Sequence, residues 1–281
     1  MIARLHALAE GARQHALLAL HALAGAQPIA LGLALIAYLL GVVVIGARLR
    51  AAARALSVTL SLPRASAIGL SAVFASHVTV GAAAGEVARL GWLNRAAAGA
   101  PDAMRRALAI VAVDRVADGI AIGALILAGA IAGAPNRGLV LALVPVVLFA
   151  AALLVFAGLG CKTAPRQLAA GVARALPAAL VAWALDLSRV YLVARAVGLP
   201  LGLTAICGLA LAAMIGGHAP VPGGLGAVEV AMVATGLALD LPSGPLVAAV
   251  LVDRSLTYGL GTTLGALCAG QLVRLPLRRP A

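Results

Sequence analysis

Carboxylates and arginines recur in two pairs of short motifs inside otherwise apolar sequence. The first pair of motifs is built on Glu-Val-Ala and the second on Val-Asp-Arg. The charged members are Glu86, Asp114, Arg115, Glu229, Asp253 and Arg254. Carboxylates can pair with cations or exchange protons, and the planar arginine fork binds oxyanions such as phosphate through two hydrogen bonds. These residue types predict a polar site for a phosphate or another charged group.

The two Glu motifs resemble each other over a longer stretch. "HVTVGAAAGEVARL" at 77–90 and "HAPVPGGLGAVEVA" at 218–231 each contain a His, a break of small residues or Gly and Pro, and then Glu-Val-Ala. Glu86 therefore corresponds to Glu229. His77 corresponds to His218, and these two residues are candidates for a proton relay or phosphate contact, with an interhelical hydrogen bond as the alternative for each.

A Val-Asp-Arg motif follows each Glu, so the repeat extends through both halves of the chain. The charge pattern predicts that the helix with Asp114 starts on the side of the membrane where the helix with Asp253 ends. Such inverted repeats with interrupted helices are typical of transport sites near the bilayer midplane.

The second break contains an unusual density of Pro and Gly. Pro220 and Pro222 would end one helix, and Gly223, Gly224 and Gly226 would open the next. The N-terminus of that half-helix would favour an anion such as phosphate. The alternative interpretation is that these glycines only allow helices to pack closely.

The composition indicates a membrane protein. Hydrophobic residues make up 63% of the 281 residues and charged residues 11%. The apolar runs are continuous rather than alternating, which predicts helices and not a β-barrel. The net charge of +12 comes from Arg clusters beside apolar segments with few aromatics, so the pattern favours topology signals over nucleic-acid binding.

The cysteines have neither metal nor redox spacing: Cys161, Cys207 and Cys268.

The predicted class is therefore an all-α polytopic membrane protein, located in the plasma (inner) membrane. We expect apolar segments at 28–46, 66–85, 105–133, 138–160, 177–197, 201–217 and 245–273. Basic clusters all lie in the cytoplasm only if the segments around Glu86 and Glu229 fold back as broken or re-entrant helices. The predicted organisation is an interfacial helix over 1–26, a membrane domain over 27–273 and a basic cytoplasmic tail over 274–281.

Several charged residues inside the spans have possible partners on the same helix. Arg115 with Asp118 and Asp186 with Arg189 are spaced i,i+3, which places each pair on one helical face. Asp114 and Arg115 point about 100° apart, so we expect them not to satisfy each other well and to reach across to the broken segments.

Longer-range pairing is less determined by the sequence. Glu86 with Arg254 and Glu229 with Arg115 are natural candidates. A charged side chain in a membrane interior costs at least about 2.5 kcal/mol, so each should pair or face water. The alternative to a binding site is a set of structural ion pairs that fixes the helix bundle.

Four segments together carry a family resemblance: "AAAGEVARLGWLNR", "VAVDRVADG", "PVPGGLGAVEVA" and "VLVDRSLTYG". Over residues 27–273 the chain resembles the transmembrane region of lysylphosphatidylglycerol synthases, a flippase-like integral membrane family. The resemblance implies a site at Gly85, Glu86, Arg89, Asp114, Arg115, Pro222, Gly223, Gly224, Gly226, Glu229 and Arg254. It also implies movement of modified lipids between leaflets. Other stand-alone members are associated with polyprenyl-linked sugar or hopanoid pathways.

The leading hypothesis is a lipid flippase for a phospholipid or a polyprenyl-linked lipid with a phosphate or charged head. We expect no aminoacyl-tRNA-dependent lipid synthesis, because the chain ends at Ala281 without room for the aminoacyl transferase domain of the best-known members. We expect no enzyme activity, because the sequence contains no zincin motif, no Ser nucleophile elbow and no metal cluster. We also expect no cofactor and no metal. A nucleotide-driven step is not expected either, because no P-loop motif occurs. The alternatives are an intramembrane enzyme acting on lipid heads and a scaffold for a separate synthase. A homodimer or a separate lipid-modifying synthase are possible partners.

Overall fold

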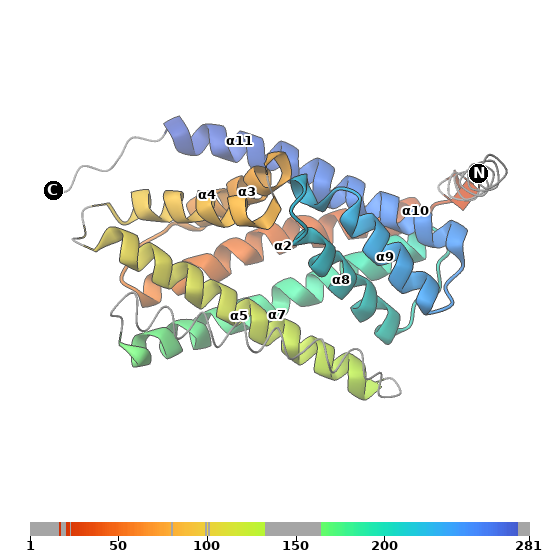
Figure 1. The fold of residues 1–281 in the computed structure, drawn as a ribbon, viewed down its shortest axis with the longest axis horizontal. Coiled ribbons are helices and arrows are strands. Elements are labelled where there is room, and N and C mark those ends of the chain that lie inside the picture. The colour runs from red at the N-terminus through yellow and green to blue at the C-terminus, as the bar shows by residue number, and fades with distance from the viewer. Residues whose placement is uncertain are drawn as a thin grey trace, which may run out of the picture.

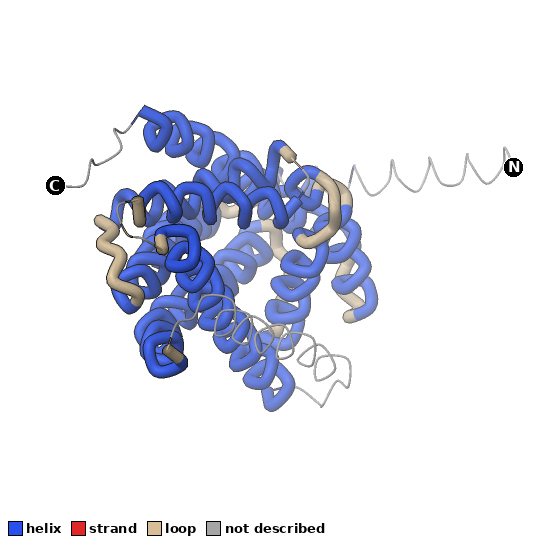
Figure 2. The backbone as a smooth tube through the Cα atoms, turned by 60° about the vertical axis from the view of Figure 1, so that its left-hand side comes forward, coloured by secondary structure: helices blue, strands red, loops and turns tan. Residues whose placement is uncertain are grey.

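The computed structural model describes residues 17, 21–22, 24–79, 81–98, 100, 102–132 and 164–274. Every regular element in this part of the chain is helical, and short loops join the helices (Figure 2). The predicted all-α class is confirmed. Most of the expected interfacial helix over 1–26 lies outside the described residues, as do the segment 138–160, Cys161 and the tail beyond Arg274.

The first half of the fold contains a helical hairpin between two long helices. The elements are α2 (Pro28–Ala55), α3 (Leu62–Val78), α4 (Gly81–Ala96) and α5 (Ala103–Ala132). Proline occupies the first turn of α2 and of α3, where its missing N–H is not needed. The helix breaks between α3 and α4, a few residues before Glu86, and α4 packs back against α3.

The second half repeats this order. Its elements are α7 (Pro165–Ala196), α8 (Leu203–Gly217), η1 (Pro222–Gly224), α9 (Ala227–Ala238), α10 (Ser243–Arg254), η2 (Ser255–Leu260) and α11 (Gly261–Arg274). The last helix is continuous from α10 through the π-helical turn η2 to α11. Helix α7 corresponds to α2, the α8–α9 hairpin to the α3–α4 hairpin, and the continuous last helix to α5.

The two hairpins point toward each other from opposite ends of the molecule (Figure 1). Their tips are in close contact. A Cβ added to Gly81 at the start of α4 would lie only 2.7 Å from the Ala219 carbonyl oxygen. Each hairpin thus enters the bundle from one end of the molecule and returns to that same end. This arrangement confirms the predicted inverted repeat with two re-entrant segments.

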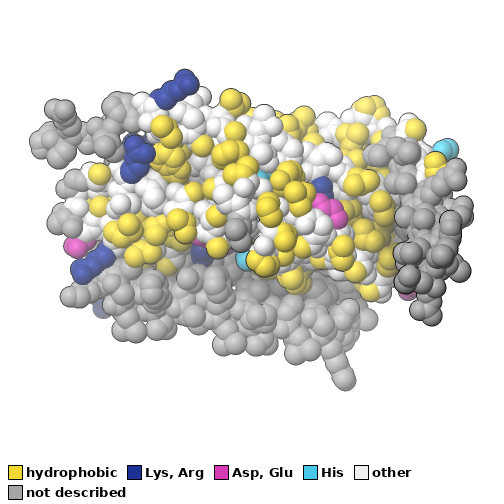
Figure 3. All heavy atoms as spheres, turned by 45° about the horizontal axis from the view of Figure 1, so that its top comes forward, with side chains coloured by type: hydrophobic (Ala, Val, Ile, Leu, Met, Phe, Trp, Pro, Cys, Tyr) yellow, Lys and Arg dark blue, Asp and Glu magenta, His cyan; other side chains and the backbone are white. Residues whose placement is uncertain are grey.

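The long helices fit the dimensions of a bilayer. By length and composition, α2 and α7 are each apolar enough to cross a membrane, whereas α8 and 222–238 are apolar but shorter. Helix α5 has 30 residues, about 45 Å at 1.5 Å per residue. Hydrophobic side chains cover much of the exposed surface between the ends (Figure 3). The exterior therefore suits an apolar surrounding.

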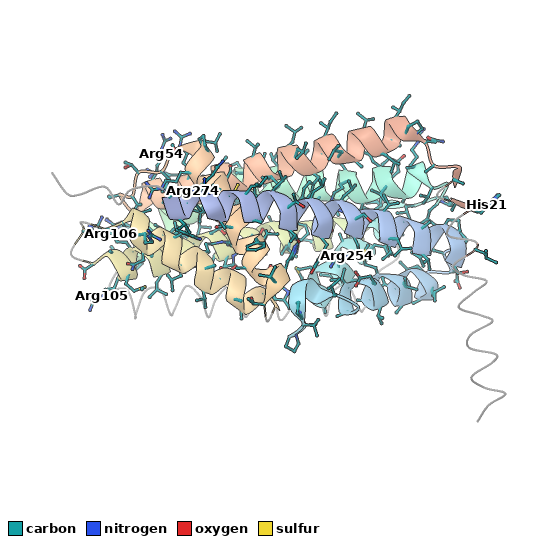
Figure 4. The ribbon with its side chains drawn as sticks, turned by 90° about the horizontal axis from the view of Figure 1, so that it is seen from above. His21, Arg54, Arg105, Arg106, Arg254 and Arg274 are labelled. Carbon is teal, nitrogen blue, oxygen red and sulfur yellow. The ribbon has the colours of Figure 1, made fainter. Side chains whose placement is uncertain are left out.

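Basic residues gather at one end of the molecule. Figure 4 places Arg54, Arg105, Arg106 and Arg274 at the same end, and Arg254 midway along the bundle. These arginines come from the end of α2, the start of α5 and the end of α11. Three segments far apart in the sequence thus share one side, as the re-entrant hairpins require.

The central packing is between α2 and α7, which contact each other along much of their length. Both helices bury mainly alanine, and a Cβ on Gly46 would collide with Ser66 of α3. Small residues of this kind allow helix backbones to approach closely in membrane bundles. Two arginines, Arg48 and Arg189, are buried on these same helices.

Candidate functional site

Asp114 is the centre of an ion-pair cluster in the first half. Its side chain accepts hydrogen bonds from Arg48 Nε at 2.7 Å, Arg89 Nη1 at 3.1 Å and Arg115 Nη2 at 2.8 Å. Arg48 also contacts Asp118. Because Asp114 is only 1% exposed, these bonds tie α2, α4 and α5 together away from water.

Two further carboxylates complete this first-half cluster. Asp118 accepts hydrogen bonds from Arg115 Nη1 at 3.2 Å and from Trp183 Nε1 of α7 at 2.9 Å. The predicted i,i+3 pair of Arg115 and Asp118 is therefore confirmed. Glu86 Oε1 lies 3.4 Å from Arg89 Nη1 and 3.7 Å from Arg115 Nε. We use the term first-half cluster for Arg48, Glu86, Arg89, Asp114, Arg115 and Asp118.

A second-half cluster lies on α7, α9 and α10. Arg189 donates to Asp186 Oδ1 at 2.8 Å, as the i,i+3 spacing predicts, and also contacts Asp253. Arg254 Nε donates to Glu229 Oε1 at 2.8 Å. The second-half cluster thus consists of two arginines and three carboxylates.

The two clusters repeat one arrangement. In each, an arginine seven residues before the end of the long first helix pairs with the Asp of the Val-Asp-Arg motif. The Arg of that motif pairs with the Glu of the hairpin. The corresponding residues are Arg48 and Arg189, Asp114 and Asp253, Arg115 and Arg254, and Glu86 and Glu229.

Arg48 is a site residue that the sequence interpretation assigned elsewhere. Arg48, Arg50 and Arg54 form one of the Arg clusters beside apolar segments that are interpreted from the sequence as cytoplasmic topology signals, but Arg48 is 3% exposed and ion-paired. Arg189 was expected to pair with Asp186 and was not placed in the site. The signal that identifies both is positional, because they occupy matching places on α2 and α7.

The suggested long-range pairs are wrong. Glu86 does not reach Arg254, and Glu229 does not reach Arg115, because each hairpin packs against the long helix that follows it in its own half. Asp114 and Arg115 do reach the first broken segment, at Arg89 and Glu86, as expected. The expectation that they do not pair with each other is wrong. The Arg115 side chain is long enough to bend back to the neighbouring carboxylate at 2.8 Å.

A central cavity of about 400 Å³ lies between the two halves. Its apolar lining comes mainly from α2, α3, α7 and α8, including residues 37–45 in the middle of α2. Its charged lining comes from both clusters: Arg48, Arg89, Arg115, Asp118, Asp186 and Arg189. The cavity thus combines an apolar wall with arginines at mid-length of the bundle.

Three of the arginines in the cavity wall, Arg89, Arg115 and Arg189, retain a free donor. The Nε atom of each is buried and has no hydrogen-bond partner among the described residues. Arg89 is 7% exposed and Arg189 4%. A buried donor without an acceptor is costly, so each is available to an acceptor that enters the cavity, such as a phosphate oxygen or water.

A second cavity of about 270 Å³ lies where the hairpin tips meet. Asp253, Arg254 and Gly223 line it, and His77, Arg189, Ala213 and Thr257 line both cavities. The two spaces are therefore neighbours, with Arg189 in the wall of each.

The two predicted relay histidines occupy different surroundings. His77 lies between the cavities, with Nδ1 2.8 Å from Thr262 Oγ1 and its ring stacked on Tyr258 at 4.5 Å. His218 is exposed, its Nδ1 lies 2.8 Å from the Met214 carbonyl oxygen, and it lines neither the central nor the second cavity. The geometry joins His77 to the site and leaves His218 outside it.

The Pro-Gly break forms the tip of the second hairpin. Gly223 has φ 57° and lines the second cavity, and its carbonyl accepts a hydrogen bond from Arg254 Nη2 at 2.9 Å. A Cβ there would collide with the Tyr258 ring. Pro222, Gly224 and Gly226 line neither of the cavities described above. The break thus serves close packing as well as the cavity wall.

Residues 18–265 match the family described as lysylphosphatidylglycerol synthase TM region. The chain belongs to this family. Membership agrees with the resemblance carried by the Glu and Val-Asp-Arg motifs and gives the chain a membrane, lipid-related function. Comparison with curated proteins returned no match.

Proposed function

We propose that this member of the lysylphosphatidylglycerol synthase TM family moves a lipid between the two leaflets of a plasma membrane that it crosses several times. The observation that carries the proposal is the central cavity, which joins an apolar wall to arginines with free donors. A phosphate or other charged head would enter this cavity. The acyl or prenyl tails would remain in the bilayer beside the apolar helix faces.

The position of the cavity supports this path. One face of α2 between Ala37 and Arg48 lines it, and this segment lies near the middle of a helix of 28 residues. Arg89 and Arg115 would bind the head oxyanion, because arginine donates to phosphate oxygens in a planar fork. Asp114 would not contact the head itself. Its carboxylate, 1% exposed, would orient the arginines, since it accepts hydrogen bonds from three of them.

Filling the cavity tests the proposal without touching a charge. A Cβ on Gly41 meets no atom within 4 Å, and Gly41 lines the central cavity. We expect Gly41→Leu to place its side chain in that space and to slow leaflet exchange of tail-labelled phosphatidylglycerol in proteoliposomes by about tenfold or more. That factor corresponds to about 1.4 kcal/mol of barrier.

The matched control lies on the same helix. A Cβ on Gly32 also meets no atom within 4 Å, but Gly32 is exposed and lines neither cavity. Gly32→Leu should exchange lipid at the rate of the unmodified protein. Equal rates for both variants would contradict a path through the central cavity.

The same vesicles separate transport from catalysis. Chemically unchanged labelled lipid on the opposite leaflet supports a transporter that is not an enzyme. A new lipid species in the mass spectrum would support an intramembrane enzyme, with the buried carboxylates as general acid and base.

A further inference from the structure

The two clusters differ by one unit of net charge. The first-half cluster has three arginines and three carboxylates, whereas the second-half cluster has two arginines and three carboxylates. The repeat shows where the difference arises. Both halves share two arginines and two carboxylates, which balance. The first half adds Arg89 and Asp118, which also balance, whereas the second half has Met232 and Thr257 at those positions. The second half adds only Asp186, where the first half has Ile45.

The surplus negative charge lies where one arginine serves two carboxylates. Arg189 contacts both Asp186 and Asp253. Asp253 is 4% exposed, whereas the Asp186 side chain is 39% exposed and lines the central cavity. An unbalanced charge in a membrane interior tends to neutralise by binding a proton. Of these two carboxylates, Asp186 is therefore the more accessible to cavity water.

The charged and titratable side chains around Asp186 do not supply the missing cation. The same cavity is lined by Tyr38 and Arg48 of α2, His77 of α3, Arg89 of α4, and Arg115 and Asp118 of α5. The three arginines are balanced by the three carboxylates of the first-half cluster. On α10, Arg254 pairs with Glu229. Within the described residues no group of three or more His, Cys, Asp or Glu could hold a metal ion. A proton therefore suits this position better than a metal ion.

We propose that Asp186 binds one proton for each anionic lipid head that crosses, so that the chain couples lipid movement to the proton gradient. This inference depends on the proposed function. A phosphodiester head brings one negative charge beside a cluster that already has one in surplus. A proton from cavity water adds to a carboxylate oxygen of Asp186 and removes the repulsion. It returns to water when the head leaves, so lipid and proton cross as a neutral pair.

The coupling is measurable in proteoliposomes that contain tail-labelled phosphatidylglycerol. With an imposed pH difference, we expect the labelled lipid to accumulate in the leaflet facing the alkaline side. The limit for one proton per lipid is about tenfold per pH unit. A potassium diffusion potential without a pH difference should leave the distribution unchanged, because the pair is neutral.

Asp186→Asn removes the surplus charge permanently. We expect this variant to move lipid but to lose its response to the pH difference, and Asp186→Glu to retain that response. Asp240→Asn is the matched control, because Asp240 is exposed and its positive φ of 57° also suits asparagine. The inference is overturned if the unmodified protein follows the potential instead of the pH difference. It is also overturned if Asp186→Asn still follows the pH difference.

A second measurement does not depend on lipid movement. At constant pH, adding ether-linked phosphatidylglycerol, which has no ester carbonyl, to the purified full chain should raise the infrared carboxylic-acid C=O band. The rise should be absent in Asp186→Asn and persist in Asp240→Asn. If lipid stays in its leaflet but this band behaves as expected, the proposed function fails and the proton site stands. If lipid moves but the rise persists in Asp186→Asn, the proton site fails alone.

Discussion

Buried arginines hold the interior of this bundle together through shared carboxylates. Asp114 accepts from three arginines, and Arg189 contacts two aspartates. Such pairs add little net stability compared with apolar packing, but removing one partner leaves an uncompensated charge. The contribution of each charged side chain to stability therefore depends on whether its partner is present.

Arg48→Gln tests this dependence. The change removes a positive charge that both Asp114 and Asp118 contact, and we expect the free energy of unfolding to fall by about 3 kcal/mol or more. Arg54→Gln, at the exposed end of the same helix, should change it by less than about 0.5 kcal/mol. Denaturant unfolding in detergent followed by circular dichroism measures both. Similar values for the two variants would show that Arg48 is not a structural ion-pair partner.

The tips of the two helical hairpins place interrupted, non-helical backbone midway along the bundle. The α3–α4 and α8–α9 hairpins meet at their tips, and Gly81 has φ 63° where the tips touch. The π-helical turn η2 faces the same junction, since Thr257 lines both cavities and Tyr258 stacks on His77. The junction is thus formed by elements from both halves.

Gly81→Ala tests the contact between the hairpin tips. A Cβ would lie 2.7 Å from the Ala219 oxygen and would require a left-handed conformation, so we expect a loss of about 1–3 kcal/mol of stability. Gly91→Ala in the interior of the same helix meets no atom within 4 Å and should raise stability by about 0.5–1 kcal/mol. Thermal unfolding in detergent compares the two. A shift in the same direction for both would contradict the close approach at Gly81.

The whole molecule has two chemically different ends. Arginines from three segments share one end, and the turn between α9 and α10 lies at the other (Figures 1 and 4). Positive residues near the ends of spans favour the cytoplasmic side. The arrangement therefore predicts a definite orientation in the membrane.

Cysteine labelling tests this orientation. In a variant whose native cysteines are replaced by alanine, Arg54→Cys and Arg274→Cys should react with a membrane-impermeant maleimide from the cytoplasmic side. Asp240→Cys should react from the opposite side, because the α8–α9 hairpin opens there. Labelling of positions 54 and 240 from one side would contradict the inverted arrangement.

Sequence by itself determined the helical class, the inverted repeat and the local pairs of Arg115 with Asp118 and Asp186 with Arg189. These follow from composition, from matching motifs and from the fixed geometry of one helical turn. Only the tertiary structure decided which carboxylate each motif arginine meets, that Arg48 is buried, and where the cavities lie. Those features depend on how separate helices pack, and a long arginine side chain can reach several partners whose distances no local spacing fixes.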